Sequence, residues 1–244
     1  MSDPFDLARE RVLVTNVTGF LGLPAALACA DRGARVFCHD LGFAEPAVRN
    51  AFARRHPGLT ALAAQAPREA VAECGPLSCV VSNDDHPAIR SPLGATTVDE
   101  LRAALEQLCV APLALAAAVV EPMRRRGGGK LVFVTSAAPL RGIANYAPYV
   151  AARGGANALA KTLALELAKD GIKVIAFAPN FVESPTYFPT ELLADPQTRA
   201  KIERQVPLGR LASPEEAGAV LAFLVSPAAD FLTGATVPFA GGWA

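Results

Sequence analysis

The stretch Arg11-Val-Leu-Val-Thr-Asn-Val-Thr-Gly-Phe-Leu-Gly22 decides the fold, because it joins a short apolar run to a turn and then to a helical segment. The apolar, β-branched residues 11–15 are typical of a buried strand. Residues 22–32 predict a helix that ends at Gly33, and a second apolar run follows at 34–38. A strand, a helix and a second strand in this order indicate a βαβ unit, whose two strands lie parallel.

The same alternation continues along the rest of the chain. Further strands are predicted at 77–81, 130–135, 173–177 and 235–239, and further helices at 45–55, 98–126, 149–169 and 214–225. This pattern predicts an α/β fold with a doubly wound, Rossmann-like parallel sheet, formed by residues 1–244 as a single domain. A proline-rich excursion at 179–207 interrupts the alternation. Because such sheets bind ligands outside the carboxyl ends of their strands, we expect the chemistry there.

The composition excludes several classes of protein. The chain has 244 residues, 52% of them hydrophobic, and its 23 Lys and Arg balance its 23 Asp and Glu. Zero net charge argues against nucleic acid as a partner. The longest apolar run, 108–122, is shorter than the ~20 residues of a membrane span, so we expect no membrane segment. Five cysteines without a Cys-x-x-Cys pair and three scattered histidines favour a cytoplasmic protein without disulfides or a metal site.

The turn between the first strand and the first helix lacks most glycines of a dinucleotide site. Such sites use glycines so that backbone N–H groups can approach a pyrophosphate at the start of the helix. In the register Thr-Gly-x-x-x-Gly-x-Gly, Asn16 and Phe20 replace two glycines and only Gly22 remains. The Phe20 ring would occupy space that a dinucleotide needs. In a shifted register, Gly19 and Gly22 would still serve a cofactor.

Asp40 also allows two interpretations. It follows the second predicted strand, where NAD-dependent enzymes place an acidic residue against the ribose hydroxyls. An aspartate at a strand end also commonly caps a turn. A single carboxylate cannot replace the missing glycines of the phosphate site, so we predict that the protein uses no cofactor.

Ser136, Tyr149 and Arg153 are the strongest candidates for a catalytic group. Ser136 follows a predicted strand on the ligand side of the sheet, and Tyr149 and Arg153 share one helical face. Arginine stays protonated, so it cannot relay protons as lysine can, but its charge stabilises a nearby phenolate. Tyr149 would then act as a base near neutral pH, while Ser136 binds the substrate oxygen. The alternative is a turn serine beside a surface Tyr–Arg pair.

A second candidate site follows the strand predicted at 173–177. The turn Pro179-Asn180-Phe181-Val182 offers backbone N–H groups and an asparagine amide, which together can form an anion-binding nest. Excluding water from such a nest strengthens its hydrogen bonds to an anion. The side chains that would form this dry wall are aromatic: Phe20, Phe181, Tyr187 and Phe188. The alternative is a Pro-Asn turn with phenylalanines that belong to the core.

Together these residues resemble the halohydrin (haloalcohol) dehalogenases, which are cofactor-free relatives of the short-chain dehydrogenases/reductases. Where that superfamily has Tyr-x-x-x-Lys, this chain has Tyr149-Val-Ala-Ala-Arg153, and Leu108 replaces the asparagine of the usual proton relay. The resemblance implies that Tyr149 deprotonates a vicinal halohydrin while Ser136 binds the same oxygen, so that the alkoxide expels halide and forms an epoxide. It assigns halide and substrate binding to Phe20, Pro179, Asn180, Phe181, Val182, Tyr187 and Phe188.

The resemblance has further implications. In reverse, the enzyme would open epoxides with small anions, and the protein would form a homotetramer with helices 98–126 and 149–169 at an interface. It would need neither a cofactor nor a metal. Two other functions stay open: an NAD(P)-dependent reductase with an atypical turn would bind NADH beside Phe20, and a non-catalytic member would bind a small ligand without turnover.

Overall fold

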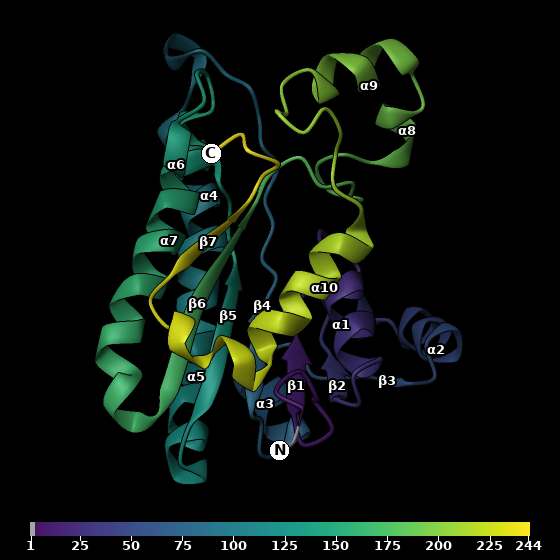
Figure 1. Cartoon of the computed structure of the whole chain (residues 1–244), viewed down its shortest axis with the longest axis vertical. Helices are drawn as coiled ribbons and strands as arrows, with labels where there is room; N and C mark the ends of the chain where they lie inside the picture. Colours follow the sequence, from purple (N-terminus) through teal and green to yellow (C-terminus); the bar gives the residue numbers. More distant parts are fainter. Residues whose placement is uncertain (1–2) are drawn as a thin grey trace.

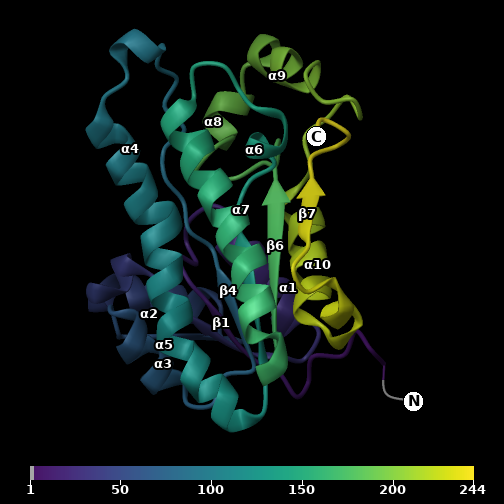
Figure 2. The same ribbon diagram turned by 90° about the vertical axis from the view of Figure 1, so that its left-hand side faces the viewer.

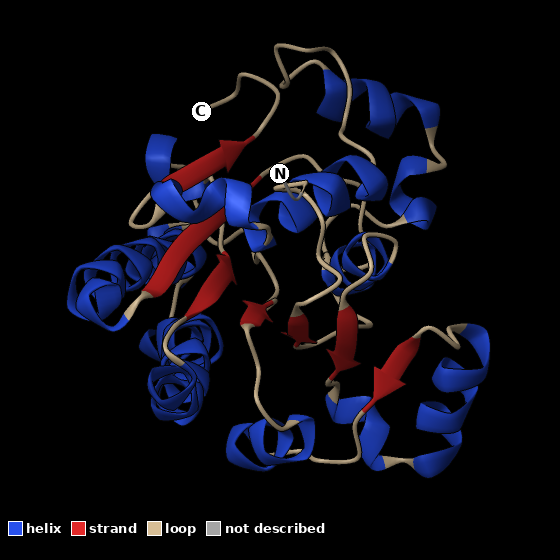
Figure 3. Ribbon diagram, turned by 60° about the horizontal axis from the view of Figure 1, so that its bottom comes forward, coloured by secondary structure: helices blue, strands red, loops and turns tan. Residues whose placement is uncertain are grey.

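A seven-stranded parallel sheet forms the centre of the fold (Figure 3). The computed structural model describes residues 3–244. The strands are β1 Arg11–Val14, β2 Arg35–Cys38, β3 Leu59–Ala61, β4 Cys79–Ser82, β5 Gly129–Val134, β6 Ile172–Pro179 and β7 Thr236–Phe239. They lie in the order β3-β2-β1-β4-β5-β6-β7. The predicted doubly wound sheet is therefore confirmed, and its strand order reverses between β1 and β4, where such folds bind ligands.

Helices cover both faces of this sheet (Figure 1). One face packs against α1 Gly22–Ala30 and α10 Pro214–Val225, and the other against α3 Pro67–Cys74, α5 Ala111–Arg126 and α7 Ala147–Leu167. α4 Val98–Leu105 continues through a π-helical turn, Glu106–Val110, into α5. The shorter helices are α2 Pro46–Arg55, α6 Ala138–Arg141, α8 Thr190–Leu193 and α9 Pro196–Glu203.

The central strands alternate between two hydrophobic cores. Val12 and Val14 of β1 pack towards α1 and α10, whereas Leu13 packs towards α3, α5 and α7. A parallel strand buried on both faces appears in the sequence as a continuous apolar run, which is why these strands could be predicted. β3 was not predicted: it pairs with β2 at the edge of the sheet, and only Leu59 of its three residues is buried.

The continuous helix Val98–Arg126 belongs to one helical layer, in which its second half, α5, packs against the sheet. By length and composition it is apolar enough to cross a membrane, and about a third of its most apolar stretch is buried in this structure. It lies beside α7, and Figure 2 shows the two running together. The expectation of no membrane segment rested on the shorter run 108–122, and the helix as a whole is longer than that run. Its contacts with α7 and the sheet account for the part that is buried.

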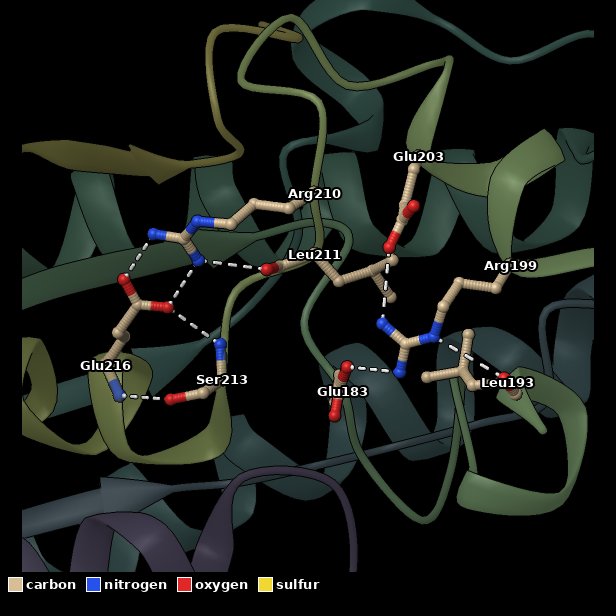
Figure 4. A network of polar contacts seen from close by, with 8 residues as sticks. All are labelled: Glu183, Leu193, Arg199, Glu203, Arg210, Leu211, Ser213 and Glu216. Carbon is tan, nitrogen blue, oxygen red and sulfur yellow. Dashed lines mark hydrogen bonds and ion pairs between the residues drawn. The ribbon is translucent and has the colours of Figure 1, made fainter. Parts of the chain in front are cut away.

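Arg199 fixes the segment that leaves the sheet after β6 (Figure 4). Its Nη2 donates to the Glu183 carboxylate at 2.8 Å, and its Nη1 contacts Glu203 of α9 at 3.2 Å. Its Nε donates to the carbonyl oxygen of Leu193 at 3.4 Å. One guanidinium thus joins the start of the proline-rich segment to the two short helices, α8 and α9, that the sequence analysis did not predict.

Arg210 fixes the other end of the segment, where α10 begins (Figure 4). Its two terminal nitrogens each lie 2.7 Å from a carboxylate oxygen of Glu216. Ser213 and Glu216 also cap α10 reciprocally, since each side chain accepts the backbone N–H of the other. Because both ends are fixed in this way, the residues between them are held over the carboxyl ends of the strands.

Of the three glycines in the dinucleotide pattern only Gly22 is present, and the variant Gly22→Ala tests why a glycine is needed there. A Cβ at position 22 would lie 2.6 Å from the carbonyl oxygen of Asn16 and 2.6 Å from the Cα of Val17, and backbone atoms cannot easily give way. We expect Gly22→Ala to lower the free energy of unfolding by about 1–3 kcal/mol in urea titrations. The control is Gly94→Ala, since a Cβ there has no neighbour within 4 Å. Equal unfolding midpoints for the two variants would contradict the explanation.

Candidate active site

The backbone N–H groups of the turn before α1 bond to the protein itself. In a dinucleotide-binding fold, N–H groups at this helix start hold the pyrophosphate. Here the N–H groups of residues 18 to 22 donate, in order, to Asp40 Oδ2, Asn16 O, Thr186 Oγ1, Asn83 Oδ1 and Gly19 O, at 2.9–3.2 Å. Three of the five acceptors are side chains from distant parts of the chain. The turn therefore holds no free donor for a phosphate in residues 18–22.

Asp40 caps this turn. Its Oδ2 accepts from the backbone N–H of Thr18 at 2.9 Å and from the Thr18 hydroxyl at 2.7 Å. Its Oδ1 accepts from the N–H of Gly42 at 2.9 Å. With the side chain buried and both oxygens engaged, the turn-capping interpretation is the one that the structure supports, and ribose binding is not.

The two residues that replace glycines keep a glycine-like backbone. Asn16 has φ of 47° and Phe20 has φ of 35°, in the left-handed region that costs side-chain-bearing residues free energy. The Phe20 ring packs edge-on against Tyr187, with centroids 4.7 Å apart, and faces the Arg153 guanidinium at 5.9 Å. Occupied donors and a ring packed into the site mean that these residues do not fit a dinucleotide.

A cavity of about 380 Å³ lies beside Phe20, at the carboxyl ends of β5 and β6. It brings together residues that the sequence analysis selected from five separate segments. Nine of the ten predicted site residues line it: Phe20, Ser136, Tyr149, Pro179, Asn180, Phe181, Val182, Tyr187 and Phe188. The tenth, Arg153, lies behind the wall and bonds to two of its tyrosines.

Arg153 is the central polar residue of this site, and only 1% of its surface is exposed. Its Nε donates to the Tyr149 hydroxyl at 3.3 Å, its Nη2 to the Tyr187 hydroxyl at 2.9 Å and its Nη1 to the carbonyl oxygen of Val134 at 3.0 Å. Burial opposes the charge, but the two phenol oxygens outweigh burial and raise the pKa of Arg153. The guanidinium is therefore a fixed positive charge beside the Tyr149 oxygen.

Ser136 is held in the turn that follows β5. Its Oγ accepts the backbone N–H of Ala138 at 3.0 Å, and its carbonyl oxygen accepts from Asn157 Nδ2 at 3.2 Å. The next residue, Ala137, donates its N–H to the carbonyl oxygen of Pro179 at 3.1 Å. Since Oγ already accepts one hydrogen bond, its own proton can point into the cavity, and the serine turn is tied to the turn after β6.

The turn after β6 differs in one respect from the predicted nest. The Oδ1 of Asn180 accepts the N–H of Phe181 at 3.0 Å, so this N–H is engaged within the turn. Asn180 Nδ2 is buried and has no hydrogen-bond partner among residues 3–244. Phe181 has φ of 55°, and its ring packs against Phe188 and edge-on against Trp243. Asn180 Nδ2 is thus a buried donor that this turn leaves without an acceptor.

Several cavity residues were not predicted from the sequence. They are Ala88, Ala138, Ile143, Tyr146, Leu192, Ile202, Gln205 and Trp243. Trp243 is reached through Gly241 and Gly242, whose positive φ values of 59° and 85° turn the chain after β7. Arg141 covers the indole ring at 4.9 Å and donates to the Trp243 carbonyl oxygen. The pair Gly241-Gly242 is therefore the sequence feature from which a turn that brings Trp243 to the cavity could have been predicted.

Leu108 is the residue that the resemblance to the superfamily matches with the asparagine of a proton relay. It is buried in a small apolar cluster with Ala104 and Ala152, and Tyr149 belongs to the same cluster. An apolar side chain cannot pass protons. Protons that leave Tyr149 need another route.

Comparisons with known proteins agree with this geometry. A family model described as enoyl-(acyl carrier protein) reductase matches residues 19–244. The cis-4-hydroxycyclohexanecarboxylate dehydrogenase of Sinomonas cyclohexanicum is 33% identical, with 96% of each chain covered. A solved dehalogenation enzyme is 45% identical, with a TM-score of 0.94 and coverage of 98% of this chain and 100% of that one.

A second solved structure is a halohydrin dehalogenase bound to ethyl (2S)-oxiran-2-ylacetate. It is 37% identical, with a TM-score of 0.91 and coverage of 95% of this chain and 96% of that one. These matches span nearly the whole chain, and they confirm the resemblance that rested on Ser136, Tyr149 and Arg153. The chain therefore belongs to the short-chain dehydrogenase/reductase family and, within it, to the halohydrin dehalogenases.

Proposed function

We propose that this protein converts vicinal haloalcohols to epoxides and halide by intramolecular displacement, and opens epoxides with small anions in reverse. The observation that carries the proposal is the buried Arg153 guanidinium, which bonds to the Tyr149 hydroxyl at the wall of the cavity. A fixed positive charge at this place favours a phenolate, which is a base. The related halohydrin dehalogenase is bound to an oxirane, and this is the class of product that the reaction would form.

The first step is removal of the hydroxyl proton. The Tyr149 phenolate takes the proton from the haloalcohol oxygen, and Ser136 donates a hydrogen bond to the same oxygen. Both side chains line the same cavity, and the proposal places the haloalcohol oxygen between them. A well-placed general base accelerates such a step by about 10²–10⁴-fold.

The second step is displacement of the halide. The alkoxide oxygen forms a bond to the neighbouring carbon while the carbon–halogen bond breaks on the opposite side, and the electron pair leaves with the halide. Holding the oxygen at Ser136 and Tyr149 and the halogen at the turn after β6 fixes this in-line arrangement. No hydride moves, so the reaction requires no nicotinamide, in keeping with the turn at residues 18–22.

Halide binding is assigned to the Asn180 side chain. Its buried Nδ2 has no partner among the described residues, and Asn180, Phe181 and Phe188 all line the cavity. An N–H donor in a dry environment stabilises a weakly hydrated anion more strongly than it would in water. Phe20, Pro179, Val182 and Tyr187 complete the wall for the halide and the substrate.

Asp84 is a second titratable group near Arg153. It accepts a hydrogen bond from Ser82 and lines a separate cavity of about 280 Å³ next to Asn16 and His39. Burial raises the pKa of Asp84 to about 6, although Ser82 and Arg153 oppose the shift. A carboxyl group with such a pKa changes its charge near pH 6, and this charge interacts with the Arg153 guanidinium.

We further propose a homotetramer in the cytoplasm. The helix Val98–Arg126 and α7 carry apolar side chains on their outer faces, among them Val98, Val110, Leu113 and Leu165, which are 65%, 47%, 45% and 80% exposed. Neighbouring subunits would cover this surface. The five cysteines are all free thiols, as a reducing compartment favours. Light scattering on the purified protein measures the assembly directly.

The variant Tyr149→Phe tests the base. Without the phenol oxygen no group can accept the hydroxyl proton, so we expect halide release to fall by about 10²–10⁴-fold. The measurement is chloride release from 1,3-dichloro-2-propanol without nicotinamide, with circular dichroism as the control for folding. Turnover close to that of the wild type would show that another group is the base. NADH-dependent reduction without halide release by the wild type would favour the reductase alternative.

The variant Asn180→Asp tests the halide site. Aspartate keeps the oxygen that accepts the Phe181 N–H but replaces the amide donor by a charged oxygen that repels an anion. We expect bromide to bind at least about tenfold more weakly, because a hydrogen bond to a charged partner contributes roughly 1.5–3 kcal/mol. Saturable quenching of the single tryptophan, Trp243, reports binding, because it lines the same cavity. Unchanged quenching would place the halide elsewhere.

The variant Asp84→Asn tests the environment of this carboxyl group. Its folded-state pKa of about 6 lies above the value near 3.9 of an unfolded aspartate. The folded state therefore binds more protons between these pH values, and stability falls as the pH rises from about 4 to about 6. Asparagine lacks this charge, so we expect the Tm difference between Asp84→Asn and the wild type to be more positive at pH 7.5 than at pH 4. Equal differences at both pH values would contradict the buried carboxylate.

A further inference from the structure

Tyr187 makes more contacts with the catalytic group than a wall residue requires. Its hydroxyl accepts from Arg153 Nη2 at 2.9 Å, donates to the carbonyl oxygen of His86 at 3.0 Å and contacts the His86 N–H at 3.3 Å. Its ring packs edge-on against Phe20 and at 5.8 Å from the Tyr149 ring. Two phenols from distant segments therefore share one guanidinium.

The hydrogen bonds distinguish the roles of the two phenols. A hydroxyl that donates to a carbonyl oxygen must keep its proton, and this is the case for Tyr187 with His86. Burial also raises the pKa of Tyr187, and the Tyr149 oxygen adds to this shift, while Arg153 opposes it. Tyr187 thus keeps its proton, which leaves Tyr149 as the phenol for the proposed role of base.

The shape of arginine places the two phenol oxygens side by side. Nε and Nη2 lie on the same edge of the planar guanidinium, and they donate to Tyr149 and to Tyr187 respectively. Nη1, at the other end, donates to the carbonyl oxygen of Val134. If the Tyr187 hydroxyl were removed, Nη2 would lose its partner and the guanidinium would be held at only one position besides Tyr149.

We infer that Tyr187 is a positioning residue for the base: its hydroxyl orients Arg153 so that the guanidinium stabilises ionised Tyr149, while its ring forms part of the cavity wall. This inference rests on the proposed function of Tyr149. It adds to the role predicted from the sequence, which was substrate or halide contact alone. Removing only the hydroxyl should therefore change the ionisation of Tyr149 and leave the shape of the cavity unchanged.

A titration without substrate tests the inference independently of the reaction. The chain has three tyrosines, 146, 149 and 187, so phenolate absorbance can be followed in simple backgrounds. In Tyr146→Phe the first phenolate step reports Tyr149, and the double variant Tyr146→Phe/Tyr187→Phe retains Tyr149 alone. We expect the midpoint of that step to rise by about half a pH unit or more when the Tyr187 hydroxyl is absent. A midpoint that stays or falls overturns the inference.

Kinetics separate the hydroxyl from the ring. For Tyr187→Phe we expect the acidic limb of the pH–rate profile of halide release to move to higher pH, so that kcat on this limb falls about 3–10-fold while KM stays within about twofold. For Tyr187→Leu the same shift should be accompanied by a raised KM, since the wall is lost as well. A change in KM alone for Tyr187→Phe would leave only the wall role and overturn the inference.

The halide-release assay and the absorbance titration can fail independently, so they test the proposed function and the role of Tyr187 separately. If the wild-type protein releases no halide from any haloalcohol, the proposed function fails, but the absorbance titration still decides whether Tyr187 acts on Tyr149. If halide is released and the titration shows no change, the proposed function stands and the role given to Tyr187 is wrong. Thermal unfolding of each variant, followed by circular dichroism, ensures that only folded protein is compared.

Discussion

The burial of the Arg153 guanidinium is the constraint on which the site depends. A buried positive charge is unfavourable unless its N–H groups are bonded, and three elements supply the acceptors. The carbonyl oxygen of Val134 lies at the end of β5, and Tyr149 lies on α7 one turn before Arg153. The third acceptor, Tyr187, belongs to the segment after β6, which the ion pairs of Arg199 and Arg210 hold in place. The compact ammonium of a lysine could not hold two phenol oxygens on one flat edge in this way, so the arginine determines how these elements converge.

The sheet could be predicted because its strands are buried on both faces. Their apolar runs are visible in the sequence, as Val12 to Val14 and Val174 to Phe177 illustrate. Elements stabilised mainly at their ends were missed. The short helices α8 and α9 lie in the proline-rich segment, where capping by Asp195 and the contacts of Arg199 replace a hydrophobic pattern. Such helices leave no periodic signal for a sequence analysis to detect.

Residue types and local spacing were sufficient to predict which residues form the site. Tyr149 and Arg153 share a helical face, and Ser136 and the Pro179–Val182 turn follow strands, so the sheet brings them together. What could not be predicted depends on long-range pairing. Thr186 bonds to Phe20 across 166 residues, and Asn83 bonds to Leu21 across 62. The loss of glycines showed that a dinucleotide turn was altered, but not that its N–H groups were engaged, nor that Asn180 takes the N–H of Phe181 for itself.

The residue that replaces a glycine of the dinucleotide turn, Phe20, also contacts the residues around the proposed base, Tyr149. Phe20 lies in the altered turn, packs against Tyr187 and faces Arg153, which in turn bonds to Tyr149. The strained backbone at Phe20 is held by Thr186, and Thr186 bonds to Asp85, so the same contacts keep the ring in place. Exchanging Phe20 for a glycine would free space but leave the N–H groups of the turn occupied and Tyr187 without its aromatic partner. In this chain the ring at the altered turn is therefore connected, through Tyr187 and Arg153, to the proposed base Tyr149.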